Sequence, residues 1–69
     1  MTIKDAKDIG ELVRRRRHEL GLTQTEVAEV ANVNLRFLSE LERGKPTARF
    51  ETVMRVLATL GIELEADYR

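Results

Sequence analysis

The feature that most constrains this chain is a pair of short helical segments separated by a very short connection. Thr23 and Glu26 have the spacing of a capping box, in which a hydroxyl and a carboxylate satisfy the first amides of a helix. This spacing predicts a helix over residues 24–31. Asn34 is the next capping residue and predicts a second helix over residues 35–43. The middle of the chain is therefore expected to be two short helices joined by about three residues.

Longer helical segments flank this pair on both sides. Asp8 stands three residues before a glutamate, so the first helix is expected over residues 8–20, with Asp5 as an alternative start. The last helix is expected to begin at Thr47 or at Arg49, and a glycine ends each flanking segment. The apolar stripe of this last helix consists of Phe50, Val53, Met54, Leu57 and Leu60.

After the last helix, the apolar pattern changes from a helical period to alternation. Apolar residues alternate with acidic ones over Ile62, Glu63, Leu64, Glu65 and Ala66. Alternation of this kind predicts a half-buried strand. A single strand cannot satisfy its own backbone, and the rest of the sequence offers no second strand. We therefore expect this strand to pair with the same strand of another copy, which would give a symmetric dimer.

Composition limits the size of the core and the class of protein. The chain has 69 residues, of which 42% are hydrophobic, and it has no cysteine. A domain of about 60 to 70 residues is marginally stable without a staple, so packed helices or a partner subunit must supply the stability. No apolar stretch approaches the roughly 20 residues that span a bilayer, and the N-terminus lacks the apolar block of a secretory signal. The expectation is one soluble domain, over residues 1–69, in the reducing cytoplasm.

The charge balance neither requires nor excludes a nucleic-acid partner. Twelve basic residues balance twelve acidic ones, whereas nucleic-acid-binding domains usually carry a basic excess. The charge is unevenly distributed, because residues 1–22 carry six basic and four acidic side chains, or +2. Since the local surface field matters more than the sum, DNA binding stays open at this point.

Enzymatic chemistry is poorly supported by the sequence. His18 is the only histidine, and it stands near the end of the first expected helix, where an imidazole favours the helix dipole. The chain has no cysteine, no Gly-rich phosphate loop and no cluster with metal-ligand spacing. A core this small also encloses too little volume for a substrate pocket. We expect no catalytic residue, no metal and no cofactor.

The second short helix presents groups that could read DNA. With Leu38 at the centre of its buried face, the opposite and flanking positions are Arg36, Phe37, Ser39, Glu40 and Arg43. Arginine reads guanine, glutamate reads cytosine, and an apolar group contacts the thymine methyl. The alternative is an ordinary surface ion pair between Arg36 and Glu40, which lie one turn apart.

Two residues of this helix do not fit a simple amphipathic pattern. Phe37 is a large aromatic at the edge of the core face, and we expect it to be partly exposed. Glu42 falls near the core face, where a lone carboxylate is costly and needs a cation. Arg17, four residues after Val13, is the expected partner. The other arginines of the run, at positions 14–16, either lie over the core with their charges in water or contact phosphate or a partner.

Three stretches of the sequence form a larger pattern: residues 20–28 (LGLTQTEVA), 33–34 (VN) and 38–46 (LSELERGKP). This pattern resembles the Cro/phage-repressor (XRE-type) helix-turn-helix family, and the resemblance extends from about Ile9 to Leu60. It implies a compact all-α bundle of four to five helices, with the helix-turn-helix at about 23–43 and its second helix in the major groove. The segment at 62–66 is similar to HipB-type antitoxins, whose terminal strands pair across a homodimer.

The resemblance also implies roles for single residues. Gln24, at the start of the first short helix, matches a glutamine that binds a DNA phosphate with the help of the helix N-terminus. The positions that face bases in relatives are Asn34, Leu35, Arg36, Ser39 and Glu40. Leu35 and Phe37 depart from the polar or small residues of many relatives, and both would contact thymine methyls.

Basic residues after the second short helix match further contacts. Arg43 and Lys45 match residues that contact the DNA backbone, and Arg49 matches a basic residue near the minor groove. The pair of Arg17 and Glu42 matches an internal ion pair of the family. Arg16 departs from the family, because relatives commonly have an aliphatic residue there.

The sequence therefore predicts a homodimeric transcriptional repressor that binds an inverted-repeat operator in double-stranded DNA. The similarity to antitoxins further implies that this repressor autoregulates a toxin–antitoxin operon. Two alternatives stay open. One is a protein-binding module that mainly neutralises a toxin, and the other is a stand-alone regulator with no toxin.

Overall fold

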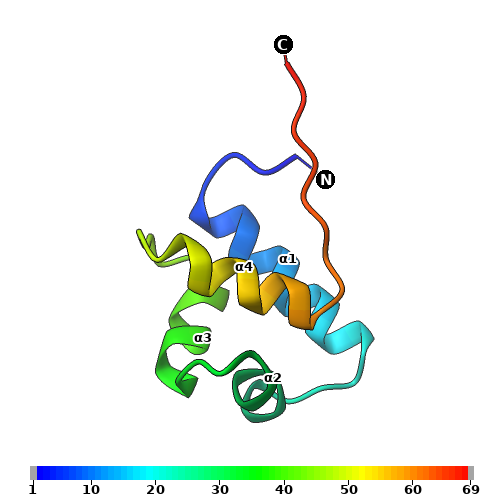
Figure 1. The fold of residues 1–69 in the computed structure, drawn as a ribbon, viewed down its shortest axis with the longest axis vertical. Helices are drawn as coiled ribbons and strands as arrows, with labels where there is room; N and C mark the ends of the chain where they lie inside the picture. Colours follow the sequence, from blue (N-terminus) through cyan, green and yellow to red (C-terminus); the bar gives the residue numbers. More distant parts are fainter. Residues whose placement is uncertain (1, 69) are drawn as a thin grey trace.

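The computed structural model describes residues 2–68, and this part of the chain contains four helices (Figure 1). They are α1 (Ala6–Glu19), α2 (Gln24–Ala31), α3 (Leu35–Glu42) and α4 (Phe50–Thr59). The described residues contain no strand. The all-helical prediction is therefore confirmed, with four helices in this part of the chain rather than five.

α1 starts at the earlier of the two expected positions. Asp5 is its N-cap, and the Oδ1 atom of Asp5 accepts a hydrogen bond from the Asp8 amide at 3.1 Å. Asp8 lies in the first turn and accepts a hydrogen bond from the Lys4 amide at 2.8 Å. Carboxylates are favoured throughout a first helical turn by the helix dipole, so either aspartate could have been the cap. The predicted start at residue 8 is wrong.

The two middle helices begin where their capping residues predicted. Thr23 Oγ1 accepts from the Glu26 amide at 3.1 Å, and Glu26 Oε1 accepts from the Thr23 amide at 2.9 Å, which completes a capping box. Asn32 ends α2 with a φ of 56°, a left-handed conformation that asparagine tolerates. Asn34 caps α3 by accepting a hydrogen bond from the Phe37 amide at 2.6 Å.

The buried face of α4 differs from the predicted stripe. The helix begins after Arg49, the later of the two expected starts. Phe50 is 69% exposed and Met54 is also exposed, although both were expected in the core. The buried apolar residues of this segment are Val53, Val56, Leu57 and Leu60. These four have helical spacing of their own, and the narrower stripe that they form leaves Phe50 and Met54 beside it.

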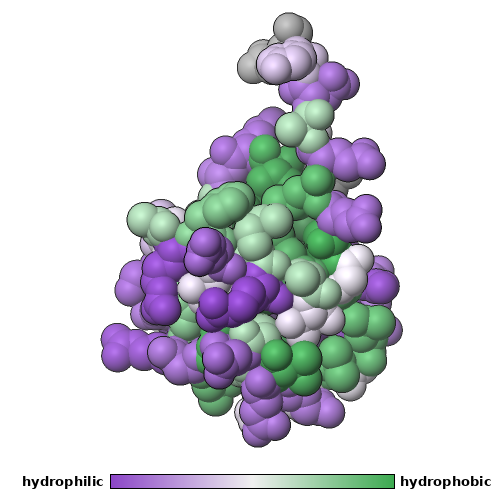
Figure 2. Space-filling view, in the orientation of Figure 1, coloured by the Kyte–Doolittle hydropathy of each residue, from purple (hydrophilic) through white to green (hydrophobic). Residues whose placement is uncertain are grey.

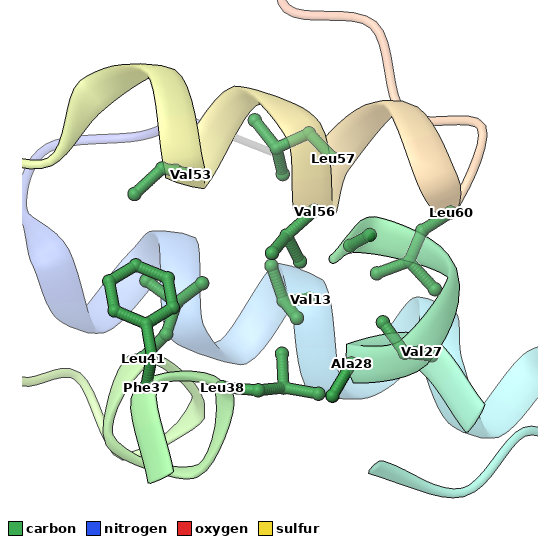
Figure 3. Close-up of a cluster of buried hydrophobic side chains, with 11 residues drawn as sticks. Val13, Val27, Ala28, Phe37, Leu38, Leu41, Val53, Val56, Leu57 and Leu60 are labelled. Carbon is green, nitrogen blue, oxygen red and sulfur yellow. The ribbon is translucent and has the colours of Figure 1, made fainter. Parts of the chain in front are cut away.

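The core lies between α4 and the other three helices (Figure 3). α1 packs against α3, and α2 packs against both α3 and α4. The buried cluster consists of Val13, Val27, Ala28, Ala31, Phe37, Leu38, Leu41, Val53, Val56, Leu57 and Leu60. Each Leu or Val that is fully buried contributes about 1.5–3 kcal/mol of hydrophobic stabilisation. Because the chain has no cysteine, this small cluster carries most of the stability.

The C-terminal segment does not form the predicted strand. The Ile62 amide donates to the Leu57 carbonyl at 2.9 Å, and the Ile62 side chain packs against the core. Residues 63–68 are exposed and run away from the helices (Figure 1). A strand requires a neighbouring backbone, and no segment of residues 2–68 lies in position to supply one. The strand expected over Ile62–Ala66 is therefore not supported.

Candidate nucleic-acid interface

α3 presents an outer face that carries the polar groups expected from the sequence. The side chain of Arg36 is 86% exposed, and Leu35 and Arg43 are exposed as well. Ser39 is half-buried, and Asn34 is exposed at the start of the helix. Because α1 and α2 both pack against α3, these groups project from a helix supported on its inner side.

Glu40 is the centre of the charge pattern on this outer face. Lys45 Nζ donates to Glu40 Oε2 at 3.0 Å, and Arg36 Nε lies 3.6 Å from the same oxygen. The hydrogen bond from Lys45, together with the positive charges of Lys45, Arg36 and Arg43, holds the pKa of Glu40 below its ordinary value. The surface ion pair between Arg36 and Glu40 is therefore present, and Lys45 is the closer partner.

A buried ion pair between α1 and α3 fixes the inner side of α3. Arg17 Nε donates to Glu42 Oε2 at 2.7 Å, and Arg17 Nη2 donates to Glu42 Oε1 at 2.9 Å. The third nitrogen of the guanidinium, Nη1, donates to the Leu22 carbonyl at 2.9 Å. The two charged side chains are only 11% and 3% exposed. The expected pair between Arg17 and Glu42 is thus present, and it joins α1, α3 and the segment that leads into α2.

Opposing effects set the pKa of Glu42. Burial alone would raise this pKa, because an apolar environment disfavours the charged carboxylate. The hydrogen bonds from Arg17 and Gln24, with the positive charges of Arg17 and His18, outweigh burial and lower the pKa of Glu42 below its ordinary value. The hydrogen bond to Glu42 is in turn the main reason why the pKa of Arg17 is raised. Both groups therefore stay charged at neutral pH.

Gln24 is positioned by the same carboxylate. Gln24 Nε2 donates to Glu42 Oε1 at 3.1 Å, and Gln24 is the first residue of α2. A primary amide nitrogen has two hydrogens, so a second N–H is left for another acceptor. The role of Gln24 in binding a DNA phosphate stays a prediction, and the structure holds its side chain at a helix N-terminus, where an anion is favoured.

Phe37 belongs to the core and not to the exposed face. Its exposed fraction is 9%, and its ring points toward α4 (Figure 3). Arg49 covers the outer side of this ring, with its Cζ atom 5.1 Å from the ring centre, a cation–π distance. The expectation of a partly exposed Phe37 is therefore wrong, because packing by α4 was not visible from the helical wheel of α3 alone.

The chain leaves α3 through a tight turn that places basic residues beside the exposed face. Gly44 has a φ of +83°, and a Cβ atom there would lie within 3 Å of the Lys7 backbone and side chain. The Lys45 amide donates to the Glu40 carbonyl at 3.1 Å, which keeps Lys45 next to α3. The roles of Arg43, Lys45 and Arg49 toward DNA stay predictions.

Gly10 allows α1 to approach the end of α3 closely, a role that the sequence analysis missed. A Cβ atom at Gly10 would lie 2.2 Å from the Leu41 carbonyl oxygen and 3.0 Å from the Glu42 carbonyl oxygen. Both are backbone atoms, which cannot rotate away as a side chain could. A glycine in the middle of an otherwise regular helix was the available sign of this contact.

Arg16 and Arg55 donate to carbonyls at helix ends, and the sequence analysis predicted neither contact. Arg55 Nε donates to the Ala31 carbonyl at 3.1 Å and Arg55 Nη2 to the Asn32 carbonyl at 3.3 Å, so α4 stabilises the turn between α2 and α3. Arg16 Nε donates to the Leu60 carbonyl at 3.0 Å. This contact gives Arg16 a structural role at the end of α4.

The groups gathered around α3 are hydrogen-bond donors, acceptors and charges. Among residues 2–68, no cluster of three or more His, Cys, Asp or Glu side chains could hold a metal ion. None of the helices formed by these residues is long and apolar enough to cross a membrane. The arrangement suits recognition of a polar, charged surface.

Comparisons with known proteins agree with this arrangement. A helix-turn-helix family model matches residues 13–66. An uncharacterized HTH-type transcriptional regulator, y4mF of Sinorhizobium fredii, is 52% identical over 63 residues, which cover 91% of this chain and 83% of that protein. The immunity repressor protein of Bacillus phage phi105 is 33% identical over 58 residues, which cover 84% of this chain and 40% of that protein.

Solved structures show the same fold. The clp gene regulator ClgR from C. glutamicum matches with a TM-score of 0.77 and 32% identity, over 90% of this chain and 80% of that one. The restriction-modification controller protein C.AhdI from Aeromonas hydrophila matches with a TM-score of 0.76 and 24% identity, over 86% of each chain. The chain therefore belongs to the Cro/C1-type helix-turn-helix family, a family of DNA-binding transcriptional regulators and not of enzymes.

Proposed function

We propose that this chain represses transcription by reading a specific duplex sequence with α3 in the major groove. The observation that carries the proposal is the contrast between the two sides of α3. Its outer side exposes Arg36 almost fully, whereas its inner side is fixed by the buried pair of Arg17 and Glu42. A helix held in this way loses little conformational freedom when it binds, so the energy of its contacts goes into recognition. The base-facing residues are Asn34, Leu35, Arg36, Ser39 and Glu40.

Residues at the ends of α2 and α3 set the register of the protein on the duplex. Gln24, held by Glu42, donates to one phosphate at the start of α2. Arg43 and Lys45 contact the DNA backbone just after α3, and Arg49 lies near the minor groove. Contacts of this kind position a protein on DNA but carry no sequence information.

The binding unit is a homodimer on an inverted repeat. Support for it comes from an open groove of about 290 Å³ beside α1, α4 and the C-terminal segment, with a mostly apolar lining that includes Phe50, Met54 and Leu64. Figure 2 shows hydrophobic residues on this face beside the C-terminal segment. Contiguous exposed apolar groups favour burial against a partner. A second copy would also offer residues 62–66 the backbone neighbour that a single chain lacks.

Selection of binding sites from random duplex DNA tests the proposed function. The expected result is a two-fold symmetric motif whose half-sites lie one helical turn, or about 34 Å, apart. Enrichment of no motif, with only salt-sensitive binding to all duplexes, would refute the sequence-specific role. Enrichment of a single asymmetric site would refute the dimer but leave the reading helix intact.

Removing the Arg36 side chain is expected to weaken binding to the selected site by about 1–3 kcal/mol and to relax specificity at one base pair. The reason is that arginine makes a bidentate contact with guanine that alanine cannot replace. Competition binding with site variants measures the effect. Lys45→Ala is the control, because loss of a phosphate contact should weaken all duplexes alike. An equal loss on every sequence for Arg36→Ala would contradict the assignment of Arg36 to base reading.

Placing a charge in the apolar groove is expected to separate the dimer. In Leu64→Asp, a carboxylate would have to be desolvated at the interface, so light scattering should report a monomer. The matched control is Val30→Asp, because Val30 is 76% exposed on α2 and does not line the groove. A Leu64→Asp variant that keeps the molar mass of a dimer would show that the subunits meet elsewhere.

The similarity to antitoxins is limited to the alternating segment at residues 62–66, and no strand forms there in the single chain. The relatives described above are named as regulators and a repressor. We therefore propose a transcriptional regulator and assign it no toxin partner.

A further inference from the structure

We infer that α1 takes part in the DNA interface, through a groove between α1 and α3 that receives a backbone phosphate. Arg14 and His18 supply the α1 side of this groove, and Arg43 supplies the α3 side. The inference rests on the proposed function and adds to it a phosphate site formed by the first helix.

The groove is an open depression of about 480 Å³ at the junction of α1, α2 and α3. Besides Arg14, His18 and Arg43, it is lined by Gln24 from the start of α2 and by Ser39 from α3. The buried Arg17–Glu42 pair also lines it. Gln24 and Ser39 belong to the proposed DNA interface, so the groove borders that interface directly.

The balance of charge in this groove favours an anion. Among residues 2–68, Glu42 is the only acidic residue that lines it, and the bidentate contact with Arg17 neutralises the Glu42 carboxylate. Within residues 2–68, neither Arg14 nor Arg43 forms an ion pair with a carboxylate. Arg14 and Arg43 both line the groove, and Gln24 and Ser39 add neutral hydrogen-bond donors. A phosphate oxygen matches this set of donors.

The four consecutive arginines of α1 lie in four different environments. Within the described part of the chain, only one of the four, Arg14, is free to bind a phosphate in the groove. Arg15 Nη2 lies 3.0 Å from Glu11 Oε1, and Arg16 donates to the Leu60 carbonyl. All three guanidinium nitrogens of Arg17 donate hydrogen bonds, two to the Glu42 carboxylate and one to the Leu22 carbonyl. Arg14 is the member of the run that lines the groove with an unpaired charge.

His18 is on the same face as Arg14 because residues four apart in a helix lie one above the other. Arg17 of the same helix pairs with Glu42 at the end of α3, next to Arg43. This ion pair joins the two sides of the groove. A phosphate that enters the groove would be contacted from α1 and α3 together, which would anchor the duplex on the N-terminal side of α2.

The test compares Arg14→Gln with Arg15→Gln in the full chain. The two variants remove the same charge from neighbouring exposed positions of one helix, so circular dichroism should show equal folding. Binding of each variant to the selected duplex and to an unrelated duplex is measured by fluorescence anisotropy over a series of salt concentrations. Arg14→Gln is expected to weaken both duplexes by the same factor and to reduce the slope of log K against log salt by about 0.9. Between about 50 and 200 mM salt, that change in slope is a difference of about threefold in affinity.

Each outcome has a defined meaning. If Arg14→Gln reduces the slope of log K against log salt and Arg15→Gln keeps the wild-type slope, the phosphate site is supported. Equal slopes for wild type and both variants would overturn it, because a merely structural role of Arg14 does not release counterions. If no motif is selected but Arg14→Gln still lowers the slope on unrelated DNA, the phosphate site stands and the sequence-specific role fails.

Discussion

Replacing Glu42 by alanine is expected to destabilise the folded chain by about 3 kcal/mol, the lower end of the range for breaking a buried ion pair. The substitution leaves the Arg17 guanidinium, which is 11% exposed, without its anion, and it removes the acceptor that holds Gln24. A chain of about 70 residues has a total stability of only about 4–10 kcal/mol. The urea concentration at the midpoint of unfolding should therefore fall by a large fraction, and the dependence of the unfolding free energy on urea concentration should stay unchanged.

The matched control replaces both partners, as Arg17→Met with Glu42→Leu. This double variant buries no charge, so it should recover most of the lost stability. If Glu42→Ala alone costs less than about 1 kcal/mol, the pair is better solvated than its burial indicates. Measuring DNA binding of the double variant separates the effect on stability from the effect on function. The double variant should fold yet bind duplexes more weakly, because Gln24 loses the carboxylate that positions it.

Acidification acts on the same ion pair. The pKa of Glu42 is lower in the folded chain than its ordinary value, so the pair stabilises the fold fully above the unfolded pKa. This contribution is lost as the pH falls through the folded pKa. The wild-type chain should therefore lose stability progressively below the ordinary pKa of a glutamate. The stability of Glu42→Gln should depend less on pH in that range. The dependence that remains reflects Glu26 and Glu40, whose pKa values are also lowered.

Changing Gly10 to alanine is expected to destabilise the chain by about 2–3 kcal/mol, the upper part of the range for overpacking. On an exposed helix, the same change would stabilise by up to about 1 kcal/mol, because alanine is the better helix former. In this chain the change destabilises rather than stabilises, because the new methyl group would lie 2.2 Å from the Leu41 carbonyl oxygen. α1 and the end of α3 must then move apart, which also strains the contacts of Arg17 with Glu42. Thermal unfolding and duplex binding should both show the loss.

Glu11→Ala is the control for Gly10→Ala. Glu11 is the next residue of the same helix, is exposed, and forms an exposed ion pair with Arg15. Its removal should change stability by less than about 0.5 kcal/mol. A Gly10→Ala variant as stable as Glu11→Ala would mean that α1 can shift without cost, and that the close approach is not required for folding.

The parts of the fold that could be predicted from the sequence are those that depend on short-range chemistry. Thr23, Asn32 and Asn34 act on amides and carbonyls within a few residues, so the positions of α2 and α3 follow from them directly. The pair of Arg17 and Glu42 was also accessible, because a carboxylate on a core face needs a cation and few were in reach. The same local rules predicted the acidic first turn of α1 but could not choose between its two aspartates.

The errors concern contacts between segments that are distant in the sequence. Phe37 is covered by α4 and Arg49, and a helical wheel of α3 carries no information about either. Phe50 and Met54 have core spacing, yet both stay exposed beside the buried stripe of α4. The alternation after residue 61 is real, but a strand also needs a neighbour. The groove that includes Arg14 and Arg43 exists only once α1 and α3 are packed together, so no local pattern marks it.

The salt bridge of Glu40 has a consequence for how this protein would search among competing sites. In the free chain, Lys45 and Arg36 already have an anion of the protein itself beside them. A duplex that approaches must displace Glu40 from these cations before its own phosphates and bases can take its place. Unrelated sequences offer only phosphates in place of Glu40, whereas a site with a suitable base for Arg36 also offers a base contact. An internal anion on the proposed reading surface would thus lower binding to unrelated genomic DNA, and a near-zero net charge would act in the same direction.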